Sequence, residues 1–122
     1  MTLDDVIRKA SDQPLVDSEV DAFCAEHSIT HEQFADAVSR SVATGYHNGD
    51  LGFSFCDGVM NHLYAFITQR GELPMPPYAQ SVFVAFDEGE YYHRDDLPGA
   101  SPEELYTKPR IRDIIARGHA VT

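Results

Sequence analysis

Positive charge is scarce in this chain, because Lys and Arg together number 9 against 20 Asp and Glu, for a formal net charge of −11. Such a surface repels phosphate backbones and anionic headgroups, so we expect neither direct nucleic-acid binding nor binding to an anionic membrane. Its field attracts a basic protein and speeds the encounter with it. A surplus of carboxylates also keeps a protein soluble, so charge alone leaves both explanations open.

Cysteine and long apolar runs are also scarce. The two cysteines, Cys24 and Cys56, form no CxxC motif, which is typical of a reducing cytoplasm and of small buried side chains, with a disulfide between them as the alternative. No apolar run is longer than Val82–Phe86, far short of the roughly 20 residues of a membrane-spanning helix. The first ten residues lack the apolar core of a signal peptide. We therefore expect a cytoplasmic location.

Length and apolar patterning predict the fold. A chain of 122 residues with 43% apolar content can bury a core as one ordinary domain. Apolar residues recur at helical spacing after recognisable helix starts. We expect an all-α, single-domain bundle of about five to six helices over residues 1–122. The strongest stripe, from about Phe53 to Gln69, is expected at the centre of the core.

The helix boundaries follow from caps, prolines and glycines. Thr2 and Thr30 resemble the starts of capping boxes, Ser18 is expected to cap the second helix, and Ser54 or Asp50 the fourth. The third helix is expected to end at about Thr44. Ser101-Pro102 predicts a helix that Pro109 interrupts, and a last helix that Gly118 ends.

Residues 77–93 allow two interpretations. A helix from Pro77 to about Gly89 fits the spacing of Tyr78, Val82 and Phe86. Alternatively, residues 82–86 and 90–93 form a short β-hairpin in a mainly α fold. We favour the helix, because the apolar run has no polar alternation and an isolated hairpin is marginally stable.

Acidic and aromatic residues follow this helix. At its C-terminus, carboxylates face the negative end of the helix dipole, which costs a few tenths of a kcal/mol each, so local stability does not favour them there. Tyrosines beside carboxylates are typical of interfaces. We call this candidate partner-binding set the acidic corner; its members are Asp87, Glu88, Glu90, Tyr91, Tyr92, Asp95 and Asp96. Alternatively, the basic C-terminal segment neutralises it through Arg110, Arg112 and Arg117.

Three other patterns are candidate sites. The acidic run from Asp12 to Asp36 fits a solvated face better than a surface that binds a basic protein. The spacing of Cys24, His27 and His31 resembles that of metal ligands, but an expected helix boundary separates the two histidines and no fourth ligand is evident. A second set, with no motif to fix its geometry, contains His47, His62, His93, Asp50, Asp57 and Asp95. We therefore predict no metal, no cofactor and no catalytic residues.

Residues 88–104 contain Glu88, then Tyr91-Tyr92, an acidic loop, and Ser101-Pro102-Glu103 at the start of the last helix. This pattern resembles the latter part of the colicin-nuclease immunity proteins, which are small, acidic, helical bacterial inhibitors of a basic nuclease. His93 stands where that family has proline, and the glycine after Ser-Pro-Glu is missing. The resemblance implies that Glu88, the two tyrosines and Asp95 contact the partner.

These observations favour an acidic binding domain that masks a basic protein, with an immunity or antitoxin role as its most concrete form. Two alternatives remain open, a small metal-dependent or His/Asp hydrolase and a homo-oligomeric structural protein.

Overall fold

The computed structural model describes residues 1–72, 74–93 and 96–121, with side chains through Gly118. Over these residues it is all-helical, with no strand, so the predicted all-α bundle is confirmed. No helix among them is long and apolar enough to cross a membrane. The helices are α1 (Leu3–Ala10), α2 (Asp17–His27), α3 (His31–His47), α4 (Phe53–Gln69), α5 (Pro77–Glu88), a short π-helix η1 (Glu103–Thr107) and α6 (Lys108–Val121).

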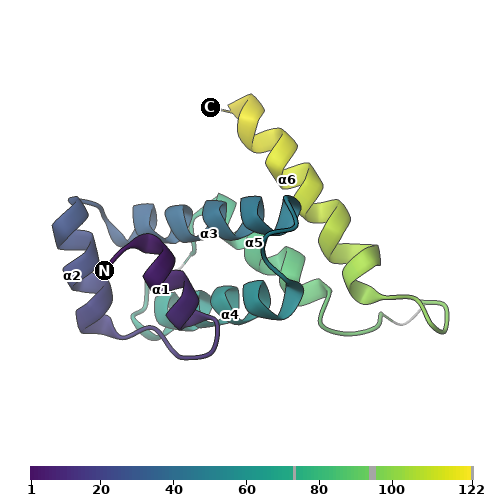
Figure 1. Cartoon of the computed structure of the whole chain (residues 1–122), viewed down its shortest axis with the longest axis horizontal. Helices are drawn as coiled ribbons and strands as arrows, with labels where there is room; N and C mark the ends of the chain where they lie inside the picture. The colour runs from purple at the N-terminus through teal and green to yellow at the C-terminus, as the bar shows by residue number, and fades with distance from the viewer. Residues whose placement is uncertain (73, 94–95, 122) are drawn as a thin grey trace.

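The centre of the bundle is built by α3, α4 and α5 (Figure 1). The short helices α1 and α2 lie at one end, and the loop from α5 to η1 lies at the other, from which α6 leads away at an angle (Figure 1). As predicted, α4 spans Phe53–Gln69 and buries its apolar stripe, including Val59, Leu63 and Phe66. Cys24 and Cys56 are buried and free, so no disulfide joins them.

Helix α5 settles the choice between helix and hairpin. It runs without a break from Pro77 to Glu88 and buries Ala79, Val82, Ala85 and Phe86 on one face. The alternative of a β-hairpin at 82–93 is therefore wrong. The burial of Val82, Ala85 and Phe86 at helical spacing explains why a run without polar alternation folds this way.

The helix starts were predicted only in part. Thr2 and Thr30 both form complete capping boxes. Ser18, Ser54 and Asp50 do not cap, because α2 and α4 begin after Val16 and Gly52, neither with a side-chain cap. Helix α3 continues to His47, beyond the predicted end at Thr44, and the Gly45 carbonyl accepts the N–H groups of the following loop.

Neither Pro109 nor Gly118 ends a helix, contrary to prediction. A proline in a helix interior lacks an N–H, and its ring clashes with the carbonyl four residues before it. Here the preceding turn is widened, since Lys108 donates its backbone N–H to the Glu103 carbonyl five residues back. This π turn accommodates Pro109, and α6 continues past Gly118 to Val121.

Candidate functional site

The acidic corner surrounds the C-terminus of α5, as predicted. Asp87 and Glu88 lie in the last turn of α5, which contains no basic residue. Tyr91 and Tyr92 follow the helix with 50% and 61% of their surface exposed. The negative charges of Asp87 and Glu88 raise the pKa of the Tyr91 hydroxyl. Asp95, and Arg94 beside it, lie outside the described residues.

An aromatic stack orders the loop that carries the tyrosines. The His93 ring lies between Tyr91 and Tyr106, with centroid separations of 5.5 Å and 3.9 Å. The Nε2 atom of His93 is 2.7 Å from the Glu88 carboxylate. Tyr106 comes from η1 and was missed in the sequence, where it lies ten residues beyond the acidic run with no pattern connecting the two.

Asp96 ties this loop to η1. Its carboxylate accepts the His93 backbone N–H at 2.7 Å and the Tyr106 hydroxyl. These hydrogen bonds lower the pKa of Asp96. Of the predicted contact residues, Asp96 is thus occupied in shaping the loop, whereas Tyr91 and Tyr92 present their rings to solvent.

A carboxyl pair extends the acidic corner onto α4. Burial, a hydrogen bond to Glu90 and the charges of Glu90 and Asp87 raise the pKa of Asp57 to about 8. Asn61, one turn along α4, donates from Nδ2 to Glu90 Oε2 at 3.1 Å. Burial and the nearby charges of Glu90 and Glu88 also raise the pKa of Asp87. The sequence placed Asp57 among possible hydrolase residues, because nothing local connects it to Glu90.

The arginines of α6 do not neutralise the acidic corner. Within the described residues, Arg110, Arg112 and Arg117 form no ion pair with any of its members. Arg117 instead lies 3.9 Å from Asp113, and Lys108 pairs with Glu104 at 2.7 Å. Among the described members of the corner, Glu88 is the one with an ion-pair partner, His93.

The remaining histidine sets are not assembled into sites in the described part of the chain. His62 Nδ1 lies 2.6 Å from the Ala10 carbonyl oxygen, so it joins α4 to α1. The His27 ring packs on Phe23 at 4.2 Å. No group of three or more His, Cys, Asp or Glu side chains gathers to hold a metal among residues 1–72, 74–93 and 96–118.

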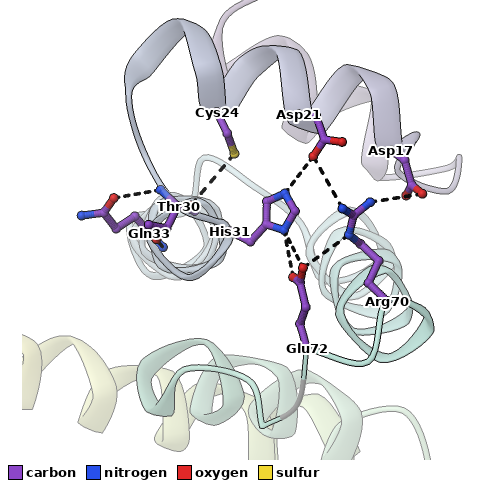
Figure 2. Close-up of polar contacts among 8 residues, drawn as sticks. All are labelled: Asp17, Asp21, Cys24, Thr30, His31, Gln33, Arg70 and Glu72. Carbon is purple, nitrogen blue, oxygen red and sulfur yellow. Dashed lines mark hydrogen bonds and ion pairs between the residues drawn. The ribbon is translucent and has the colours of Figure 1, made fainter.

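A second polar cluster, which we call the interhelix clamp, joins α2 and α3 to the end of α4 and the connector after it (Figure 2). His31 Nδ1 lies 2.8 Å from Glu72 and Nε2 lies 2.9 Å from Asp21. Arg70 lies 3.1 Å from Asp17, 3.7 Å from Asp21 and 3.5 Å from Glu72. Two carboxylates of the acidic run, Asp17 and Asp21, thus form ion pairs within the chain.

The clamp predicts a pH-dependent contribution to stability. Burial lowers the pKa of His31, but hydrogen bonds to Glu72 and Asp21 outweigh it and raise the pKa above its usual value. The resulting stability is present below about pH 6.5 and is lost as pH rises through the folded-state pKa. We expect His31→Gln to lower the free energy of unfolding by about 0.5–1 kcal/mol at pH 6, allowing for partial exposure, and by less at pH 9.

The measurement is urea unfolding at both pH values, with Glu72→Gln and the double variant completing a cycle. In the Glu72→Gln background, His31→Gln should cost less, because one acceptor is already gone. A pH-independent cost, or strict additivity of the two changes, would show that His31 acts through packing alone.

No family model, curated protein or solved structure matches the chain. The resemblance of residues 88–104 to immunity proteins therefore stays a prediction from the sequence.

Proposed function

We propose that this protein binds and masks a basic protein through the acidic corner, with an immunity or antitoxin-like inhibitor as the most concrete form. One observation carries the proposal. Tyr91 and Tyr92 are half or more exposed beside carboxylates at the negative end of α5, and no cation of α6 through Gly118 is paired to those carboxylates. Exposed tyrosines in such a field match the anchors of a protein interface.

The surface around the tyrosines offers further apolar contacts. Leu97 is 77% exposed and Leu105 is 44% exposed. Leu97 lies in the loop held by Asp96, and Leu105 lies in η1 beside Tyr106. Scattered exposed leucines are common on any protein. Here both belong to the two segments, the loop after α5 and η1, that the hydrogen bond from Tyr106 to Asp96 joins.

The loop is also pre-organised by the contacts described above. Glu88 and Tyr106 hold the His93 ring, and Asp96 accepts the His93 backbone N–H. Tyr91 stacks on that ring with the two planes 12° apart. An anchor that is ordered before binding loses less conformational entropy on association. The proposed partner would supply Lys or Arg side chains to Asp87 and Glu90, and these cations would lower the raised pKa of Asp87.

Tyrosine truncation tests this proposal. A partner captured from the source organism should be basic, and Tyr91→Ala and Tyr92→Ala should each weaken its binding about tenfold or more. The association rate should fall as salt rises, because steering by the net charge of −11 is screened. Surface plasmon resonance at increasing ionic strength measures both effects.

Val16→Ala is the matched control, because Val16 is 45% exposed at the start of α2, at the opposite end of the molecule. It should change affinity by less than about twofold. A neutral or acidic partner bound at salt-independent rates would exclude the proposal. So would a loss of binding in the tyrosine variants that is fully explained by unfolding in circular dichroism.

A further inference from the structure

A groove lies between α5 and α6, toward the N-terminus of α5 and away from the acidic corner. Its volume is about 680 Å³, within the range of roughly 300–1,000 Å³ typical of small-molecule sites. One face of α6 and one face of α5 line it, joined by one side chain of α3. We call it the arginine groove after Arg40, Arg110 and Arg117; its apolar wall includes Tyr78, Val84 and Ile114.

The charge of the groove is opposite to that of the protein. Three of the chain's 9 basic side chains line it, in a chain with 20 acidic residues, and Asp113 is the one carboxylate among the described lining residues. Asp113 and Arg117 are 3.9 Å apart, with 73% and 81% of their side chains exposed. An ion pair this exposed contributes little to stability. Among the described residues Arg110 forms no ion pair.

The third arginine is held by the apolar wall. The Arg40 guanidinium lies over the Tyr78 ring, 4.1 Å from its centroid. Stacking of this kind fixes the plane of the guanidinium while leaving its N–H donors free to bind an anion. Asp36 attracts Arg40 electrostatically, but in the described part of the chain the two do not approach within ion-pair distance.

We propose that the arginine groove binds a small organic anion, with a carboxylate or phosphate on the arginines and an apolar body against Tyr78, Val84 and Ile114. Arginine forks pair with both oxyanion types in bidentate geometry. A polyanion such as RNA would meet the surrounding negative field as well, whereas a small anion meets only the charges that line the groove, three arginines and Asp113. This site is separate from the acidic corner, so either proposal can fail without the other.

Phenyl phosphate is a suitable probe, because it combines an oxyanion with an apolar ring. Amide chemical shifts followed by NMR should move saturably at Tyr78, Arg110 and Gly118, with a Kd of roughly 1 mM or tighter. Inorganic phosphate should bind more weakly, and phenol should not saturate. Arg110→Gln and Arg117→Gln should each weaken phenyl phosphate about tenfold, as expected for loss of a charge-assisted hydrogen bond.

Arg112→Gln is the matched control, since Arg112 is exposed on α6 but does not line the groove. It should leave the Kd within about twofold, and unfolding curves should show that all three variants fold. The proposal is overturned if phenyl phosphate causes no saturable shift, if phenol binds equally well, or if Arg112→Gln weakens binding as much as Arg110→Gln. Tighter binding of an acidic peptide than of phenyl phosphate would also overturn the assignment to a small anion.

Discussion

Replacing Gly58 with alanine should lower the free energy of unfolding by about 2–3 kcal/mol, although alanine favours an isolated helix by about 1 kcal/mol over glycine. Gly58 lies in α4 where α1 ends. A Cβ atom at this position would lie 2.1 Å from the Ser11 carbonyl oxygen and 3.1 Å from its carbonyl carbon. These are backbone atoms, so the clash cannot be relieved by turning a side chain.

Relief would require α1 to move away from α4. That movement would disturb the hydrogen bond from His62 to the Ala10 carbonyl and the burial of Ile7 and Ala10. Urea unfolding followed by circular dichroism measures the effect. The matched control is Gly118→Ala in α6, where the new Cβ would be 3.5 Å from Tyr78 and 3.7 Å from Arg40, ordinary contact distances.

Gly118→Ala should therefore raise the free energy of unfolding, by up to about 1 kcal/mol. Equal changes in the free energy of unfolding at the two positions would mean that helix propensity, and not the packing of α1 on α4, determines the effect of Gly58→Ala. The contrast matters for the fold, because the contact at Gly58 positions the short α1 against the central helices.

The parts of the fold that the sequence predicted are local. The capping boxes at Thr2 and Thr30 and the long apolar stripe of α4 need only residues within one or two turns. The predicted helix boundaries were wrong where contacts between distant segments override the local sequence pattern. Pro109 reads as a helix stop in the sequence, yet a π turn admits it and the buried Thr107, which donates to the Ala85 carbonyl at 2.7 Å, holds η1 on α5.

The acidic corner shows the same limit. Its carboxylates and tyrosines are adjacent in the sequence, so the dipole argument was sufficient to find them. Asp57 and Tyr106 belong to the same place but come from α4 and η1, and no spacing rule links either to residues 87–96. The clamp around His31 likewise joins three segments that are far apart in the chain.

The carboxyl pair of Asp57 and Glu90 should make the protein less stable as pH rises, the reverse of ordinary acid unfolding. Burial and the hydrogen bond to Glu90 raise the pKa of Asp57 to about 8, against about 4 in an unfolded chain. The folded state therefore binds this proton more tightly. Between about pH 4 and pH 8 the free energy of unfolding falls as pH rises, because the unfolded chain has lost this proton while the folded state still holds it.

Asp57→Asn should remove this dependence. An amide is close in shape to the neutral acid and can still donate a hydrogen bond to Glu90, but it never ionises. We expect the variant to exceed the wild-type free energy of unfolding by about 1–2 kcal/mol at pH 8, a value reduced for the partial exposure of the pair, and to match it near pH 4.5.

The measurement is urea unfolding from pH 4.5 to pH 8.5, with an NMR titration of the Asp57 carboxyl carbon in the wild-type protein as an independent readout. Asp50→Asn is the control, because it also removes one negative charge from an acidic chain, but from an exposed loop position. If the free energy of unfolding depended on pH in the same way in both variants, net charge, and not the pair of Asp57 and Glu90, would set that dependence. A destabilised Asp57→Asn at pH 8 would contradict the shared proton, since it would require the charged carboxylate to be the favoured form.

If the expected pH dependence is found, it also bears on binding, because a cation from a partner placed at Glu90 would lower the pKa of Asp57 and release a proton at neutral pH.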